Sequence, residues 1–546
     1  MIDLCIKGGT LYDPANGING VATDLWIDSG KVVAAPPDLK ASKLLDARGY
    51  VVMPGGVDMH THLAGPKVNA ARGLRPEERR GAAPGVGSVP TTRLTGLKYA
   101  GLGFTTALDA AVAPLFARQA HMELADTPII DKGFLALISD NHFVLDAVRD
   151  GDRARLDEYL RWLLASCGGF GFKAVNPGGV EHWKETGRRT LVDVDSRIDA
   201  FGITPRQIVG ELAAAADRLA LPHPLHIHCN NLGVGGNWKT TAATIDAFGA
   251  SRAHLAHVQF HSYDGRPDDD GSVASAVPAL VDLLRNKGDI SVDVGHVTFG
   301  ATTALTGDGP LGHFLHRVTG AKWFSADVEC EGGCGVVPVE YKHRSLFHSV
   351  QWAVGLEWYL LMDPWRTGFS TDHPNGGSFW RYPETLALLM SRDVRREKIK
   401  NLHPSLHERC TLPEIDREFS LNEVAIVTRA APARRLGLKH KGHLGAGADA
   451  DLVIYQPDAD RERMFSFPRY VIKGGRIVLD DGELREEPEG TTFAAETGDA
   501  KEFDGLRNEF SKGYSISLEH WGLRASERAG LKKILSAGSA AATRAT

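Results

Sequence analysis

The chain has 546 residues, which is too long for one compact unit, so we expect a large domain with smaller additions. Its hydrophobic fraction of 43% and charged fraction of 24% are ordinary for a soluble globular protein. The net charge of -6 lacks the basic excess that phosphate binding needs, which argues against nucleic acid as the main partner. No apolar run approaches the roughly 18 residues of a membrane span, and no signal peptide opens the chain. The six cysteines form no CxxC pair, so we expect a cytoplasmic protein without a membrane partner.

Short alternating strands separated by Gly, Asn and Asp turns fill the start of the chain and return near its end. The turn at Ile6 to Gly9 is echoed by the sequence from Ile472 to Gly475. We therefore expect both ends to pair in one small β-sandwich, from which the middle of the chain is inserted. The predicted boundaries are residues 1–54 and 431–490 for the β-sandwich, 55–430 for the insertion and 491–546 for a C-terminal extension whose end is disordered.

The inserted segment alternates apolar strands with helices rich in Ala and Leu, such as Arg206 to Leu219. This alternation is typical of a parallel α/β architecture, and eight such strands close into a (β/α)₈ TIM barrel. The eight candidate strands are one that ends near residue 62, then 104–108, 133–137, 170–175, 225–228, 254–258 and 290–294, and one that ends before residue 370.

Two histidines close the first of these strands. Residues two apart on a strand face the same way, so His60 and His62 present two imidazoles to one point. Two neutral imidazoles on a rigid strand make half of a divalent-metal site, and zinc is the commonest occupant of such sites. The alternative is two polar residues on an edge strand.

Polar residues also follow later strands, at the end of a barrel where active groups gather. Lys173, His228, His257 and Asp372 each come at or just after the end of an apolar strand. A buried lysine is an expensive charge unless it is used, although an ordinary salt-bridged lysine is the alternative. His226 faces the same way as His228, so either histidine can be the ligand.

The order of these residues resembles that of the amidohydrolase superfamily, over nearly the whole chain. The resemblance implies an amidohydrolase-type barrel with two divalent metal ions, most commonly zinc, joined by N6-carboxylysine at Lys173. His60 and His62 would hold one metal together with Asp372, and His228 and His257 would hold the other. Asp372 would also be catalytic, accepting a proton from water and passing it to the leaving nitrogen.

Longer stretches narrow this resemblance. Residues 60–69, 171–178, 224–233 and 372–377 are similar to the A subunits of formylmethanofuran dehydrogenase and the α subunits of the formyltransferase/hydrolase complex of methylotrophic bacteria. The family resemblance implies cleavage or reversible formation of the N-formyl group of formylmethanofuran, with formate and methanofuran as the other partners. It also implies other subunits of the complex as partners in one-carbon metabolism.

Several side chains next to the ligand strands are candidate substrate contacts. Lys67, Asn69 and Asn230 lie just beyond those strands, and hydrogen bonds that stabilise the loops are the alternative role. Methanofuran-type carriers have acidic tails, so basic side chains are expected to meet them. The candidates in the long first loop, which a subunit contact would equally explain, are Arg72, Arg75, Arg79 and Arg80.

Two other functions fit the same residues. A stand-alone cyclic amidase of the hydantoinase or dihydroorotase type would use the same metals with a different pocket. A catalytically silent platform subunit would bind no metal. Metal content and activity on a ring amide distinguish these alternatives from deformylation.

Overall fold

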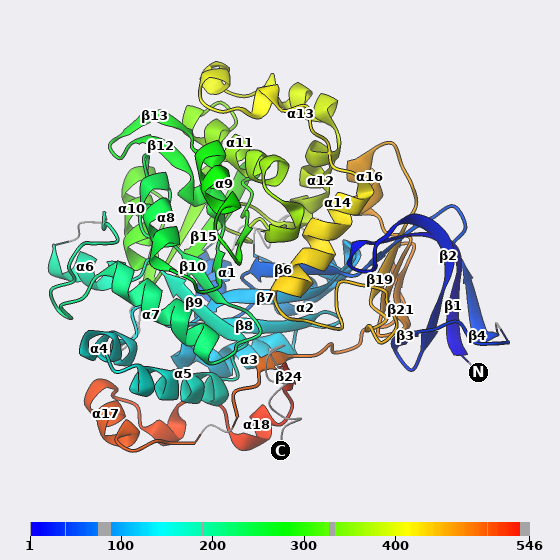
Figure 1. The fold of residues 1–546 in the computed structure, drawn as a ribbon. Coiled ribbons are helices and arrows are strands. Elements are labelled where there is room, and N and C mark those ends of the chain that lie inside the picture. The colour runs from blue at the N-terminus through cyan, green and yellow to red at the C-terminus, as the bar shows by residue number, and fades with distance from the viewer. Residues whose placement is uncertain are drawn as a thin grey trace.

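The computed structural model describes residues 2–38, 40–74, 89–187, 191–326, 333–498 and 501–534. Its centre is an eight-stranded parallel sheet in which neighbours in space are neighbours in the chain (Figure 1). The first and last strands meet through a parallel bridge between Thr61 and His373, and the His62 N–H donates to the His373 carbonyl at 2.8 Å. The barrel strands are β6 (Gly56–Thr61), β7 (Phe104–Val112), β8 (Asp131–Leu137), β9 (Gly171–Val175), β10 (Leu225–His228), β11 (Ala253–Leu255), β14 (Ile290–Asp293) and β18 (Thr367–Gly368).

The predicted (β/α)₈ barrel is therefore confirmed. All residues of β7, β8 and β9 are buried, as expected for parallel strands that are covered by helices outside the sheet. The covering helices are α2 (Thr92–Gly101), α3 (Ala117–Ala125), α4 (His142–Asp150), α5 (Arg153–Cys167), α7 (Pro205–Arg218), α8 (Trp238–Ala247), α9 (Val277–Arg285), α11 (Leu346–Leu361) and α12 (Tyr382–Met390).

Local sequence signals explain where these helices begin. At α7, the Thr204 side chain accepts from the Gln207 N–H, the Gln207 side chain accepts from the Thr204 N–H, and Pro205 takes the first helical position. The helix begins one residue before the predicted start because proline is favoured at this position, where no N–H is needed.

Both ends of the chain contribute to a second, nine-stranded mixed sheet, as predicted. The two halves join where β19 runs antiparallel to β5, with Leu452 opposite Pro54. This sheet lies beside the barrel, with the N-terminal strands at its outer side (Figure 1). Its strands are β1 (Ile2–Asp13), β2 (Ile18–Asp28), β3 (Lys31–Val33), β4 (Ala41–Asp46), β5 (Val51–Pro54), β19 (Leu452–Tyr455), β20 (Tyr470–Lys473), β21 (Arg476–Asp480) and β22 (Glu483–Leu484).

A small antiparallel sheet follows the seventh barrel strand and was not predicted. Strands β15 (Gly300–Thr306), β17 (Cys334–Tyr341) and β16 (Phe324–Ala326) pair in that order, and helix α10 (Gly309–Thr319) packs on them. Residues of this insertion reach the carboxyl ends of the barrel strands, so the insertion contributes walls to the site described below.

The C-terminal extension packs against the barrel near α4 and α5 (Figure 1). Strand β23 (Phe493–Ala495) pairs with β24 (Lys532–Ile534), and the ring of Trp521 stacks on Trp162 of α5 at 5.0 Å. Helices α17 (Leu506–Gly513) and α18 (Ala525–Arg528) come between these two strands in the sequence. The predicted disordered end and the last residues of the chain, 535–546, lie outside the described residues. The exact domain boundaries stay a prediction.

Within the described ranges, no helix combines the length and the apolar character that crossing a lipid bilayer requires.

Candidate active site

One small cavity lies at the carboxyl ends of the barrel strands. Its volume is about 50 Å³, and all six of the side chains predicted as metal ligands line it. They come from five different strand ends: His60 and His62 from β6, Lys173 from β9, His228 from β10, His257 from the residues after β11, and Asp372 from the residues after β18. Every one of the six is buried.

Three ligand atoms meet at one side of this cavity. The Nε2 atoms of His60 and His62 lie 3.1 and 3.2 Å from Oδ1 of Asp372. Ligand atoms around a tetrahedral zinc ion are about 3.3 Å apart, given zinc–nitrogen and zinc–oxygen distances of about 2.0–2.1 Å. This group therefore has the spacing of a metal site. His257 lies next to this group, since one of its ring nitrogens is within 4.8 Å of the His60 and Asp372 ligand atoms, so the two sides of the cavity adjoin.

The other side of the cavity is formed by groups that lack hydrogen-bond partners. Among the described residues, nothing accepts from or donates to Lys173 Nζ or His257 Nδ1, and His228 Nε2 has only Asp308 Oδ2 at 3.6 Å, beyond hydrogen-bond distance. A buried polar group without a partner costs about 1–3 kcal/mol, and more when it is charged. Three such groups around one cavity have the chemistry that binds a cation.

Burial also sets the protonation of these groups. It lowers the pKa of Lys173 to about 7, against the attraction of Asp293 and Asp372 for the ammonium form. Burial likewise lowers the pKa of His228 and of His257, which favours neutral imidazoles, the form that binds metal.

The backbone is strained at two of the predicted ligands. His257 and Asp372 have φ angles of +33° and +49°, values that non-glycine residues rarely adopt. Gly295 lies beside both, and an added Cβ there would be 2.4 Å from the His257 Cβ. Such strain concentrates at functional sites, where the surrounding structure holds it in place.

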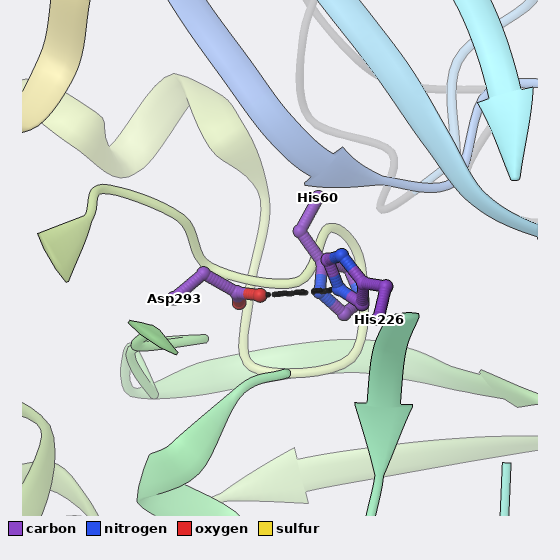
Figure 2. Close-up of side chains that lie close together, drawn as sticks. All are labelled: His60, His226 and Asp293. Carbon is purple, nitrogen blue, oxygen red and sulfur yellow. Dashed lines mark hydrogen bonds and ion pairs between the residues drawn. The ribbon is translucent and has the colours of Figure 1, made fainter. Parts of the chain in front are cut away.

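His226 lies below the cavity rather than on its wall. Figure 2 shows its ring beside that of His60, with the carboxylate of Asp293 facing both. His226 Nε2 is 3.0 Å from His60 Nδ1, the ring nitrogen of His60 that faces away from Asp372. Of the two histidines on β10, the position on the cavity wall favours His228 as the ligand.

The predicted substrate contacts do not line the cavity. Lys67 Nζ donates to the Ala111 carbonyl at 2.5 Å, Asn69 bonds to Glu123, and Asn230 Nδ2 donates to Asn176 Oδ1 at 2.8 Å. All three make the loop-stabilising bonds that were the alternative role, and direct contact with a substrate stays a prediction.

The basic side chains of the first loop are only partly described. Arg72 donates to the Pro90 carbonyl at 2.8 Å and to Asn69 Oδ1 at 2.8 Å, so its guanidinium is engaged within the loop. The other three candidates, Arg75, Arg79 and Arg80, lie outside the described residues.

Three further residues of the site were missed in the sequence. Asn375 Nδ2 donates to Asp372 Oδ2 at 2.9 Å, and the Tyr341 hydroxyl donates to the Asn375 carbonyl at 2.9 Å. Asp293 lies under His60 and His257. Asp293 lies one residue before the end of the seventh predicted strand and ends the observed β14, so the search for polar strand ends that found the other residues could have found it. Tyr341 belongs to the unpredicted insertion and carried no signal.

Comparison with known proteins identifies the family. A model of the amidohydrolase family matches residues 43–479, which include the whole barrel and all six predicted metal ligands but not strands β1 to β3 and β22 of the nine-stranded sheet. The chain belongs to the amidohydrolase family. The superfamily resemblance drawn from the six residues is thus confirmed.

Two relatives match this amidohydrolase over most of its length. Protein FwdA of Methanocaldococcus jannaschii is 39% identical, with 95% of this chain and 96% of the relative covered. The A subunit of the formyltransferase/hydrolase complex Fhc of Methylorubrum extorquens is 39% identical, with 88% of each covered. These relatives confirm the narrower resemblance that residues 60–69 and the other three stretches indicated.

A solved structure agrees with these relatives. In the crystal structure of the formyltransferase/hydrolase complex FhcABCD from Methylorubrum extorquens with methylofuran, one chain is 35% identical to the amidohydrolase. It superimposes with a TM-score of 0.91 over 98% of this chain and 99% of that chain. A D-hydantoinase structure, 16% identical with a TM-score of 0.50, shares the fold alone.

Proposed function

We propose that this amidohydrolase hydrolyses the N-formyl group of a formylmethanofuran-type carrier to formate and the free amine, a reaction that is reversible in principle. The observation that carries the proposal is the cavity: six side chains with the chemistry of metal ligands converge there, and Lys173 Nζ has no partner among the described residues. The Methylorubrum extorquens relative supports the substrate, because it is a subunit of a formyltransferase/hydrolase complex whose crystal structure was determined with methylofuran.

Two divalent metal ions, most suitably zinc, fit the donor set. His60, His62 and Asp372 would hold one ion, and His228 and His257 would hold the other, since nitrogen and carboxylate oxygen are the donors that zinc accepts. When bound, such a pair polarises a carbonyl oxygen and supplies hydroxide at neutral pH.

Lys173 would join the two ions as N6-carboxylysine. Its pKa of about 7 leaves much of the amine neutral, and only the neutral amine is nucleophilic. The Nζ lone pair forms a bond to the carbon of CO₂, one C–O π bond opens to an oxyanion, and one N–H proton leaves to solvent. The product is an anion with two oxygens, which suits two cations where an ammonium would repel them.

Asp372 is placed to move the proton of the reaction. Asn375 holds its Oδ2, while Oδ1 faces the cavity beside His60 and His62. The carboxylate accepts a proton as water adds to the formyl carbon, and returns it to the nitrogen as the C–N bond breaks. One water is consumed, and formate and an amine leave.

A larger cavity beside the first offers room for the body of the carrier. Its volume is about 370 Å³, and it shares walls with the metal cavity at Leu232, Phe260, Ala304 and Tyr341. Phe314, Leu311 and other apolar side chains line it, together with acidic residues. The apolar part of a carrier suits this cavity, whereas an acidic tail would extend past it.

We also propose that the chain is one component of a cytoplasmic formyltransferase/hydrolase complex in one-carbon metabolism. The match to one chain of the FhcABCD structure over 98% of this chain supports this assembly.

Formate release by the purified complex, together with zinc content, tests the function. We expect the wild-type complex to hold about two zinc ions in each copy of this chain and to release formate, and Lys173→Ala to lose both. The matched control is Lys132→Met, because Lys132 is a buried lysine of the neighbouring barrel strand whose Nζ donates to the Thr127 carbonyl at 2.8 Å, away from the cavity. An unaffected rate in Lys173→Ala would reject the lysine bridge.

Activity and zinc content also separate the two alternatives. Turnover of a cyclic amide by the isolated chain, without release of formate, would identify a cyclic amidase. No zinc and no activity after incubation with excess zinc would identify a platform subunit.

A further inference from the structure

Below the metal cavity lies a second polar cluster that the proposed mechanism does not use. It consists of the buried side chains of His223, His226, His254 and Asp293, and we call it the lower cluster. Resting on the proposed metal-dependent function, we propose that Asp293 and His226 are positioning residues. They keep a proton on Nδ1 of His60, so that Nε2 points its lone pair into the metal cavity.

Asp293 is the centre of this cluster. Its Oδ2 lies 2.8 Å from His60 Nδ1, 3.0 Å from His254 Nε2 and 3.3 Å from His226 Nε2. Figure 2 shows the carboxylate directed at the rings of His60 and His226. A carboxylate only accepts hydrogen bonds, so the nitrogen of His60 that faces it carries hydrogen.

The chain of histidines requires the same arrangement. His223 Nδ1 lies 2.9 Å from the carbonyl oxygen of Arg435, and a carbonyl can only accept. In a neutral ring the other nitrogen, His223 Nε2, is then an acceptor, and at 3.0 Å it receives the N–H of His226 Nδ1. His226 Nε2 is left with a lone pair, so its 3.3 Å approach to Asp293 Oδ2 is not a hydrogen bond. Its other neighbour, His60 Nδ1 at 3.0 Å, must donate to it.

Two independent partners therefore demand hydrogen on the same nitrogen of His60. The other nitrogen, Nε2, is the one that lies 3.1 Å from Asp372 Oδ1 at the cavity. Hydrogen bonds of this kind, made by the far nitrogen of a histidine ligand, fix its tautomer and its orientation at a metal site.

Asp293 also reaches the other half of the site. Its Oδ1 accepts from the backbone N–H of His257 at 2.9 Å, at the residue whose φ is +33°. One carboxylate thus orients the ring of one predicted ligand and supports the strained backbone of another. Asparagine cannot replace it, because an amide presents oxygen on one side only and its NH₂ would face a second donor.

The same atoms have the residue types of a separate metal site, formed by His60, His226 and Asp293. We favour hydrogen bonding because His60 Nδ1 and Asp293 Oδ2 are 2.8 Å apart, and because neither His226 nor Asp293 lines the cavity. Metal counting separates the two assignments.

The test measures zinc affinity in the intact complex, by competition with a chelator at a temperature where every variant is folded. Loss of such a supporting group lowers metal affinity about 10- to 100-fold. We expect losses of this size in Asp293→Asn and His226→Leu, whereas His226→Gln, whose amide oxygen can accept from His60, should keep much of the affinity. The visible spectrum of the cobalt-substituted protein should shift in Asp293→Asn, because His60 no longer holds its orientation.

The matched control is Asp131→Asn, which alters a buried carboxylate at the opposite end of the barrel. It should lower the melting temperature and leave the zinc affinity unchanged. Wild-type affinity and an unchanged cobalt spectrum in both Asp293→Asn and His226→Leu would overturn the proposal, as would three zinc ions in the wild type that fall to two in Asp293→Asn. Failure of the wild type to bind zinc would reject the proposed function instead.

Discussion

The two ends of the barrel bury charged groups in opposite ways. At the amino ends of the strands, Asp131, Asp451, Lys441 and Lys473 form a buried ionic cluster, together with Asp449 at its edge. Lys473 Nζ lies 2.6 Å from Asp131 Oδ2 and 2.7 Å from Asp451 Oδ2, and Lys441 contacts all three carboxylates. At the carboxyl ends, by contrast, Lys173, His228 and His257 leave ring or amine nitrogens without a hydrogen bond among the described residues, although Asp308 Oδ2 lies 3.6 Å from His228 Nε2.

The difference shows which buried cluster is a site. Asp131, Asp449 and Asp451 have the spacing of metal ligands, as does the group around Asp372. Lys441 and Lys473 lie between the three aspartates, and Lys31 pairs with Asp449 at 2.5 Å. Three lysines thus balance three carboxylates, so the cluster is neutralised by the protein itself. We infer that the ionic cluster joins the barrel to the nine-stranded sheet. The cavity at the other end of the barrel instead has the chemistry of a binding site.

The largest expected effect concerns Asp372, the proposed proton carrier at the carboxyl ends of the barrel strands. Asp372→Asn should lower the rate of formate release by about 10²- to 10⁴-fold, because an amide cannot accept the proton. The rate is measured on the purified complex at equal zinc content, with the exposed Asp268→Asn as control. A rate within twofold of the wild type would exclude Asp372 as the proton carrier.

Disrupting the ionic cluster at the amino ends of the strands should lower stability rather than activity. Lys441→Met removes the cation that contacts all three carboxylates, and loss of one partner from a buried ion pair costs about 3–5 kcal/mol. Denaturant unfolding measures the loss, and zinc content should be unchanged. Lys439→Met, an exposed lysine two residues away, is the control and should change stability by less than about 0.5 kcal/mol.

The ionic cluster should also make the free energy of unfolding depend on pH in a defined way. Burial would raise the pKa of Asp131 and of Asp451, but the nearby lysines outweigh it and lower both, and the three carboxylates raise that of Lys441 against burial. The carboxylates therefore contribute fully above their unfolded pKa of about 3.9, and their contribution falls as the pH drops through the lower folded values. The lysine contributes fully below its unfolded pKa of about 10.4 and loses its contribution as the pH rises through the higher folded value.

Asp131→Asn isolates the acid side of this dependence. Its melting temperature should fall less steeply than that of the wild type between about pH 5 and pH 3, since one fewer carboxylate takes up a proton on acidification. Parallel curves for the two proteins would show that Asp131 does not contribute.

The smallest effect is expected at the wall of the larger cavity. Phe314 is 41% exposed on α10, so Phe314→Ser should change stability by less than about 0.5 kcal/mol. Loss of about 1 kcal/mol of apolar contact should raise KM for the formylated carrier about fivefold and leave kcat unchanged. The control is Phe467→Ser, because Phe467 is 73% exposed and does not line this cavity. Equal KM values for Phe314→Ser and the wild type would show that the carrier does not bind in this cavity.

Much of this arrangement could be predicted because the signals are local. The eight barrel strands read as apolar runs, and His60, Lys173, His228 and Asp372 were found because polar residues stand out where such runs end. The family resemblance, rather than geometry, then assigned them to metal ions. Tyr341 and helix α10 could not be predicted in this way, because they reach the site from an insertion whose position depends on how it packs.

The choice between His226 and His228 shows the same limit. The alternation of a strand puts both histidines on one face, so their sequence positions are equivalent. Their depth in the barrel separates them: His228 lies on the cavity wall, while His226 contacts His60 and His223 below it.

The sequence by itself determined the barrel, the pairing of both chain ends and the residues that gather at the carboxyl ends of the strands, because periodicity and strand ends are properties of neighbouring residues. Only the tertiary structure decided which buried charges are paired and which nitrogen of His60 faces the cavity. Hydrogen bonds and ion pairs depend on atoms far apart in the chain, such as Arg435 and His223 or Lys441 and Asp131, which meet only after folding.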